Sequence, residues 1–275
     1  MSEERPDLTA VSLGAGVQST VMLLMLDRGE LGPKPDAAIF ADTGWEPRGV
    51  YENLEWLRQE VRIPIHVALP ARSLRQSVWD ATDVRGNRHM PIPVSVRNAD
   101  GSGAKIGRHC TRDYKILPIE RKLRELLGVK VVRSKRVVAL MGISLDEIHR
   151  CRDNKTPWIE NRYPLVEADM KRHHCLEWMA REYPERELPR SACAACPYRS
   201  DREWLALKAS DPAALEDAFE IDRRLRDVHA GLQRKGPMYI HRKMIPLDQA
   251  VAEAEAGVLL QPPLFGEDCS GVCGV

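Results

Sequence analysis

The fold is decided by a strand-to-helix turn, Ser12-Leu13-Gly14-Ala15-Gly16-Val17-Gln18-Ser19-Thr20. The apolar run Leu8–Val11 before it predicts a short buried strand, and Val21–Leu26 after it continues an apolar helix that ends near Gly29. A glycine-bearing turn at a helix N-terminus binds anions, because its backbone N–H groups and the helix dipole both favour negative charge. The hydroxyl and amide side chains of the turn add neutral donors. We therefore expect a phosphate-bearing ligand here, a nucleotide in particular.

Strands and helices alternate through the first half of the chain. Further strands are predicted at 36–41, 65–69 and 137–141, and a helix at 47–61. Strands separated by helices imply a parallel sheet that helices cover on both faces. Ligands of such sheets bind at the carboxyl ends of the strands. The turn, Asp42-Thr43-Gly44 and Gly142-Ile143-Ser144 all follow predicted strands, so we expect an α/β fold with a doubly wound parallel sheet and one shared site.

The turn differs from the two commonest phosphate loops. No Lys follows Gly16, as a P-loop requires, and only two glycines fit the register of a dinucleotide-binding turn. The turn resembles the Ser-Gly-Gly-x-Asp-Ser loop of the ATP pyrophosphatase (PP-loop) superfamily, in the variant of the phosphoadenosine phosphosulfate (PAPS) reductase family. It departs from that loop at two places: Leu13 replaces the first glycine, and Gln18 stands where many members have Asp.

Two other segments carry the same resemblance in the family's order. Asp42–Pro47 is similar to the family's Asp-Thr-Gly segment, and Gly142–Arg150 to its Gly-x-Arg-x-x-Glu-Ser-x-x-Arg segment, with Ser144 in place of the first Arg. The resemblance implies a HUP-type, Rossmann-like sheet and a bound adenine nucleotide. It implies that Arg150 meets phosphate or sulfate, for which a planar guanidinium is well suited. The nucleotide-binding residues that it implies are Ser12, Gly14, Ala15, Gly16, Gln18, Ser19, Thr20, Asp42, Thr43, Gly44 and Gly142.

The cysteines form a separate line of evidence. Cys193 and Cys196 make a Cys-x-x-Cys pair, a pattern that serves metal sites and redox dithiols alike. Residues 108–118 resemble the Cys-Cys-x-x-x-Lys-x-x-Pro segment of adenylylsulfate (APS) reductases, whose cysteines hold a [4Fe–4S] cluster; Cys110 fits, and His109 replaces the other tandem cysteine. Four thiolates suit such a cluster. The expected ligands are Cys110, Cys175, Cys193 and Cys196, with Zn²⁺ as the alternative metal and His109 or a tail cysteine as alternatives to Cys175.

The end of the chain carries two more thiols, Cys269 and Cys273, among glycines. In PAPS and APS reductases a C-terminal Glu-Cys-Gly segment carries the cysteine that attacks sulfur, so the resemblance implies a nucleophile at Cys269 or Cys273. It further implies that Lys115 and Arg150 neutralise charge in the reaction. A tail without catalytic consequence and a tail that ligates the cluster are the other interpretations.

Composition limits the class of protein. The 275 residues carry 41 basic and 40 acidic side chains, a net charge of +1, so no global field attracts nucleic acid or a membrane surface. No apolar segment approaches the roughly 18 residues of a membrane span, and seven cysteines without a signal peptide favour a reducing compartment. We expect a cytoplasmic, homo-oligomeric protein without a membrane partner.

Two regions are expected to extend the nucleotide-binding domain. An irregular lid is predicted at 81–109, within the α/β domain 1–184. Residues 185–275 are predicted to form a mainly helical extension, which carries the Cys-x-x-Cys pair and the cysteines of the tail. Residues 85–136 contain fourteen Lys or Arg but only four Asp or Glu. This segment predicts either a cover over an anionic ligand or ordinary solvated helix faces.

The resemblance leaves two chemistries and one non-catalytic role open. The favoured one is ATP-dependent (Mg²⁺-ATP) adenylation with sulfur transfer to a nucleic-acid or small-molecule acceptor. It is favoured because a serine, Ser144, stands where the family has the Arg on the sulfate side. A cysteine desulfurase or a thiol is the expected donor of sulfur or electrons. The alternative is reduction of PAPS or APS to sulfite by a tail cysteine. A nucleotide sensor without turnover is the third interpretation.

Overall fold

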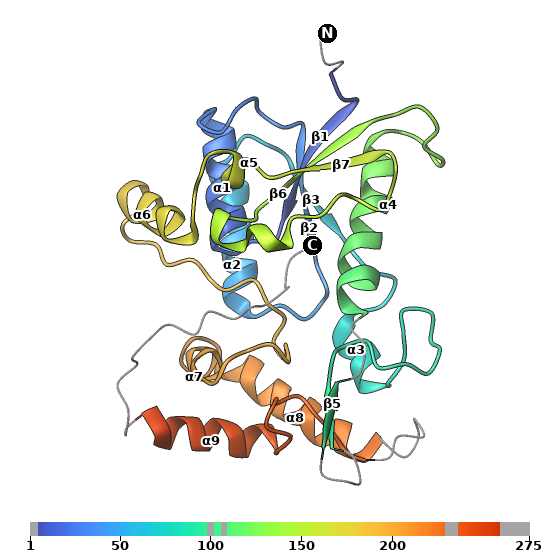
Figure 1. Ribbon diagram of the computed structural model, residues 1–275, viewed down its shortest axis with the longest axis vertical. Helices are drawn as coiled ribbons and strands as arrows, with labels where there is room; N and C mark the ends of the chain where they lie inside the picture. Colours follow the sequence, from blue (N-terminus) through green and yellow to red (C-terminus); the bar gives the residue numbers. More distant parts are fainter. Residues whose placement is uncertain (1–4, 98–101, 106–108, 229–235, 259–275) are drawn as a thin grey trace.

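The computed structural model describes residues 5–97, 102–105, 109–228 and 236–258 (Figure 1). Its centre is a five-stranded, all-parallel sheet in the order β3-β2-β1-β6-β7. The strands are β1 (Leu8–Leu13), β2 (Ala37–Ala41), β3 (Ile65–Ala68), β6 (Val137–Met141) and β7 (Ile159–Arg162). The chain order reverses on either side of β1, which gives the doubly wound sheet that the sequence predicts. The switch point between β1 and β6 is where such sheets bind ligands.

Helices cover both faces of the sheet, as expected for a parallel sheet (Figure 1). One face carries α1 (Val17–Arg28), α2 (Arg48–Glu60), α5 (Pro164–Glu167) and α6 (Arg172–Glu182). The other face carries α4 (Leu117–Leu126), which continues directly from the π-helical turn η1 (Arg112–Ile116). A 3₁₀ segment, η2 (Leu145–Arg150), follows β6 on the site side of the sheet.

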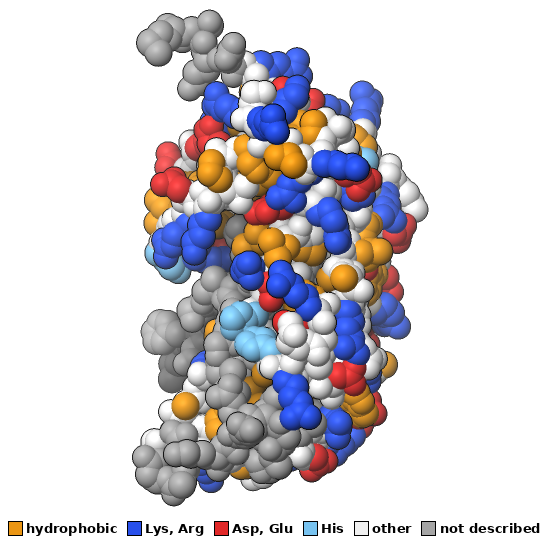
Figure 2. Space-filling view, turned by 90° about the vertical axis from the view of Figure 1, so that its right-hand side faces the viewer, with side chains coloured by type: hydrophobic (Ala, Val, Ile, Leu, Met, Phe, Trp, Pro, Cys, Tyr) orange, Lys and Arg blue, Asp and Glu red, His pale blue; other side chains and the backbone are white. Residues whose placement is uncertain are grey.

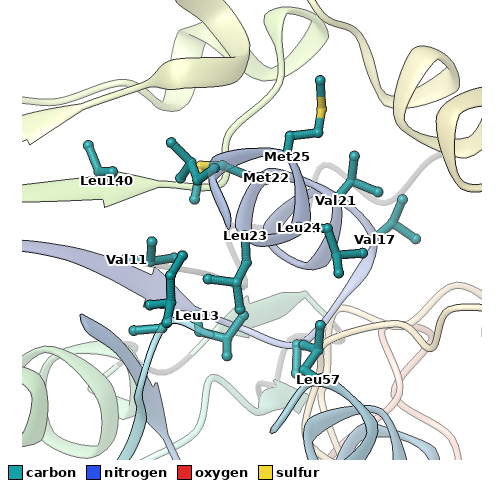
Figure 3. Close-up of a cluster of buried hydrophobic side chains, with 14 of the residues drawn as sticks. Val11, Leu13, Val17, Val21, Met22, Leu23, Leu24, Met25, Leu57 and Leu140 are labelled. Carbon is teal, nitrogen blue, oxygen red and sulfur yellow. The ribbon is translucent and has the colours of Figure 1, made fainter. Parts of the chain in front are cut away.

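Helix α1 lies at the centre of the first core cluster (Figure 3). Nine of its twelve residues are buried, because the sheet, α2 and α6 surround it; this explains an apolar run without a polar stripe. Val11 and Leu13 of β1 and Leu140 of β6 belong to the same cluster. The helix ends at Gly29, whose φ of 78° is the left-handed C-cap conformation that glycine adopts without strain. The site-forming turn therefore sits on a rigid helix.

A second core cluster lies below the sheet in Figure 1. It combines α3 (Leu74–Trp79) with three helices of the second half, α7 (Asp201–Ser210), α8 (Pro212–Val228) and α9 (Leu247–Val258). A three-stranded antiparallel sheet joins it, in the order β5 (Gly103–Lys105), β4 (Ser95–Arg97) and β8 (Met238–Tyr239). Because residues from both halves of the chain share this core, the expected boundary at 184/185 does not separate two cores.

The described part of the expected lid, 81–97, 102–105 and 109, is irregular apart from β4 and β5, and part of it is buried. Met90, Ile92, Val94 and Val96 are all buried in the second cluster. Pro91, Pro93 and Ser95 between them are buried as well, and only Ser95–Arg97 forms a strand. The prolines signal a loop in the sequence, and the burial of this stretch was not predicted.

The surface of the basic segment is mixed rather than uniformly positive. Figure 2 shows that Lys and Arg on the face that carries α4 alternate with acidic and hydrophobic side chains. At least six cations of the basic segment form ion pairs: Arg112 with Asp113, Lys115 with Glu46, Lys122 with Glu125, Arg124 with Glu120, Lys135 with Asp7 and Arg136 with Glu160. These pairs support the interpretation that the basic residues lie on solvated faces over the interpretation that they form a nucleic-acid-binding surface. In the described ranges, every helix is too short or too polar to cross a membrane.

Candidate active site

A cavity of about 610 Å³ opens at the carboxyl ends of β1, β2 and β6. The turn between β1 and α1, the end of β2 and the segment after β6 form its walls. Its lining includes Ser12, Gly14, Gly16, Gln18, Ser19, Gly142, Lys115 and Arg150 from the expected site, together with Glu46, Asp146, Glu147, Arg172, Arg190, Ser191 and Glu203. Ala15, Thr20 and Asp42-Thr43-Gly44 are not part of this lining.

The turn is fixed from within and from α2. Ser19 Oγ accepts a hydrogen bond from the Gly14 N–H at 3.2 Å and donates one to the Gly16 carbonyl at 3.3 Å. Asn53 Nδ2 of α2 donates to the Ala15 carbonyl at 3.0 Å and to Thr20 Oγ1 at 2.9 Å. Thr20 and Ala15 thus hold the shape of the turn from behind, and the backbone between them is preorganised for an anion.

Close approaches explain the glycines of the site. A Cβ on Gly16 would lie 2.7 Å from Ser191 Cβ, and one on Gly14 would lie 2.9 Å from Ser191 Oγ. A Cβ on Gly142 would lie 2.8 Å from Ser19 Cα. The end of β6 and the segment around Ser191 therefore press directly on the turn, which leaves no room for a side chain.

Gln18 is the hub of a polar network along the β6 side. Its Nε2 donates to Glu147 Oε2 at 3.2 Å and to Ser144 Oγ at 3.5 Å, and its Oε1 accepts from Arg172 Nη1 at 2.8 Å. Glu147 also accepts a hydrogen bond from Arg150. Two guanidinium groups, those of Arg150 and Arg172, thus line the cavity beside the turn.

The network brings a second arginine to the place where the sequence lacks one. Ser144 stands where the family has its first Arg, and Arg172 from the start of α6 reaches the same glutamine that contacts Ser144. The Arg172 N–H also donates to Asp146 Oδ1 at 2.9 Å, which anchors α6 against η2. Sequence reasoning missed Arg172, because only tertiary packing joins it to residues 144–147.

The loop after β2 presents Glu46, rather than Asp42, to the cavity. Asp42 Oδ1 accepts hydrogen bonds from the Gly44 N–H at 2.7 Å and from Tyr51 OH at 2.8 Å. Burial, followed by this bond to Asp42, raises the pKa of Tyr51, so the phenol remains a donor. Glu46 lines the cavity, accepts a hydrogen bond from Thr43 Oγ1 at 3.0 Å and lies 3.9 Å from Lys115 Nζ. Sequence reasoning gave Glu46 no role.

The segment that leads into the Cys-x-x-Cys pair contacts both nucleotide-site loops. Ser191 Oγ donates to the Gly14 carbonyl, and the Ala194 N–H donates to the Trp45 carbonyl at 2.9 Å. Beneath the pair, the buried guanidinium of Arg199 donates to the carbonyls of residues 192, 193 and 194. The cysteine loop is therefore built into the wall of the site.

The described thiols do not fit a four-thiolate cluster by themselves. Cys110 and Cys193 pack against the second core cluster, whereas Cys175 is fully buried in the first, beside α1. Burial raises the pKa of the Cys175 thiol to about 12, which disfavours the thiolate that a metal requires. Among the residues that the structure describes, no three His, Cys, Asp or Glu side chains gather to hold a metal. Cys269 and Cys273 lie outside the described residues, and the cluster stays a prediction.

Comparison with known proteins finds a similar domain in the first half of the chain. Residues 9–143 match the sequence profile of the phosphoadenosine phosphosulfate reductase domain. No curated protein matches the chain. Among solved structures, the chain is similar to phosphoadenylyl-sulfate (PAPS) reductase from Candida auris in its phosphate complex, with 16% identity, a TM-score of 0.43, and coverage of 68% of this chain and 76% of that chain. Residues 9–143, just under half of the chain, thus match the PAPS reductase domain family.

Proposed function

We propose that the cavity binds a sulfonucleotide, APS or PAPS, and that the enzyme reduces its sulfuryl group to sulfite. The observation that carries the proposal is the position of Arg172, which provides a second guanidinium beside Arg150 although position 144 is a serine. Planar guanidinium groups bind sulfate and phosphate oxygens through paired hydrogen bonds. On sequence grounds, the missing Arg at position 144 favoured ATP-dependent transfer. Because Arg172 supplies a second guanidinium group, that preference no longer holds.

The residues of the cavity have distinct roles in this proposal. The N–H groups of the turn and the guanidinium groups of Arg150 and Arg172 hold the phosphosulfate end of the substrate. Lys115, the ion-pair partner of Glu46, also lines the cavity. A thiolate of Cys269 or Cys273 attacks the sulfur atom, the bond between sulfur and the phosphate oxygen breaks, and the nucleotide leaves with that electron pair. The cysteine then carries an S-sulfonate.

A second thiol completes the balance of the reaction. Its sulfur attacks the sulfur of the modified cysteine, a disulfide forms, and sulfite leaves. Two thiols are oxidised while the sulfuryl group gains two electrons. The second thiol is the other tail cysteine or an external dithiol, and no step passes through a metal cluster.

Product analysis tests this proposal. Purified protein with APS or PAPS and excess dithiothreitol is expected to release sulfite and the free nucleotide in equal amounts. Cys269→Ser and Cys273→Ser identify the nucleophile, since one of them must abolish sulfite release, whereas Cys151→Ser, at the partly buried thiol after η2, is the matched control. Sulfite release that survives loss of both tail cysteines would overturn the proposed chemistry.

ATP-dependent sulfur transfer is a second candidate, which the acidic side chains of the cavity favour. Asp146 and Glu147 lie on the β6 side of the lining, and carboxylate oxygens are ligands that Mg²⁺ accepts. In this chemistry the turn holds pyrophosphate, an acceptor oxygen is adenylated, and a sulfur nucleophile displaces AMP. Pyrophosphate release from Mg²⁺-ATP, with no sulfite from APS or PAPS, would select this candidate over the first.

A further inference from the structure

Glu46 is a buried carboxylate with an unused acceptor. Only 2% of its side chain is exposed, and Thr43 Oγ1 and Lys115 Nζ both approach the same oxygen, Oε1. No described residue donates a hydrogen bond to Oε2, which is itself shielded from solvent. A buried acceptor without a donor is unfavourable. A ligand that supplies a donor at this point of the cavity wall would remove that cost.

The cavity has two chemically different ends. Its β6 side carries the guanidinium groups of Arg150 and Arg172 beside the N–H groups of the turn, together with the carboxylates of Asp146 and Glu147. Its β2 side carries Glu46, with Lys115 as its ion-pair partner. The N–H groups of the turn favour the anionic group of the ligand at the β6 side. Oε2 of Glu46 favours a hydrogen-bond donor in the part of the ligand that reaches the β2 side.

We propose that Glu46 determines nucleotide specificity: its carboxylate accepts a hydrogen bond from a ribose hydroxyl and excludes a phosphate at that position. This inference rests on the proposed function, since it assumes a sulfonucleotide with its phosphosulfate end at Arg150 and Arg172. APS carries a free 3′-hydroxyl, which is a donor. PAPS carries a phosphate there, with about −1.5 to −2 charges at neutral pH, and a carboxylate repels it. The preferred substrate is then APS, although the matching domain is named after PAPS.

Isothermal titration of three variants with APS and PAPS tests the inference. Glu46→Gln keeps the shape of the side chain but removes its charge, and it leaves the Lys115 ammonium without that carboxylate. Glu46→Asp keeps the charge. Glu52→Gln is the matched control, because Glu52 lies in the neighbouring groove that Glu46 also lines, with 64% of its side chain exposed.

The wild-type protein is expected to bind APS at least about tenfold more tightly than PAPS. Glu46→Gln is expected to lower that preference about tenfold, whereas Glu46→Asp and Glu52→Gln keep it. Equal preference in wild type and Glu46→Gln, or tighter binding of PAPS by the wild type, would overturn the role of Glu46 while leaving sulfonucleotide binding intact. Binding of neither compound by the wild type would overturn the proposed function, and the inference with it.

Discussion

Replacement of Gly142 by alanine tests whether the end of β6 supports the phosphate-binding turn. The added Cβ would lie 2.8 Å from Ser19 Cα, 2.9 Å from Ser19 Cβ and 3.0 Å from Ser19 N. Two of these three atoms belong to the backbone of the first turn of α1, so a rotamer change cannot relieve the contact. Either β6 or the start of α1 must move by several tenths of an ångström.

The magnitude follows from the cost of overpacking. Inserting a methyl group into a close-packed contact costs about 1–3 kcal/mol of unfolding free energy. For a chain of this size, each kcal/mol lowers the melting temperature by roughly 2–4 °C. Because the displaced atoms include an N–H of the turn, we also expect sulfonucleotide affinity to fall by about tenfold, or ~1.4 kcal/mol.

Urea unfolding and calorimetric titration measure the two effects. Gly257→Ala in α9 is the control, because nothing lies within 4 Å of its added Cβ. It should leave stability unchanged or raise it by up to about 1 kcal/mol, since alanine favours helix. A Gly142→Ala protein with wild-type stability and wild-type affinity would refute the reasoning that this contact shapes the site.

Three other predictions concern the cysteines and the wall of the site. Burial raises the pKa of Cys175 to about 12, so iodoacetamide at pH 8 should label it only after unfolding, as peptide mapping by mass spectrometry would show. Ser191→Ala removes the hydrogen bond to the Gly14 carbonyl; it should cost about 0.5–1.5 kcal/mol and weaken sulfonucleotide binding in a titration. Arg199→Met leaves the carbonyls of the cysteine loop without donors and should lower the free energy of unfolding in urea by at least about 3 kcal/mol. Arg202→Met, at an exposed position nearby, should lower it by less than about 0.5 kcal/mol.

The sequence was sufficient for the sheet where its strands are apolar. β1, β2 and β6 lie at the predicted places, because continuous apolar runs between helices have few other structures. The edge strand β3 was also predicted, because three of its four residues are apolar although only Ala68 is buried. β7, at the other edge, escaped prediction, since Ile159 is its only apolar residue and its only buried one. The small antiparallel sheet escaped as well, because its strands are two or three residues long and their partners are far apart in the chain.

The site was predictable where it follows a strand and unpredictable where packing assembles it. The turn, Lys115 and Arg150 line the cavity, as expected. Arg172 and Ser191 reach it from segments that no local pattern connects to the turn. Cys175 was a candidate ligand only by its position in the sequence, which carries no information about the core that surrounds it.

The most direct test of the account is calorimetric titration of APS into the wild-type protein and into Arg172→Gln, with Arg48→Gln at an exposed position as control. The account predicts saturable binding of one nucleotide per chain. It predicts that Arg172→Gln weakens binding by about 10- to 100-fold, the effect of one charge-assisted hydrogen bond, and that Arg48→Gln does not. Absence of binding, or equal affinity in the wild type and Arg172→Gln, would contradict the claim that this cavity is a sulfonucleotide site.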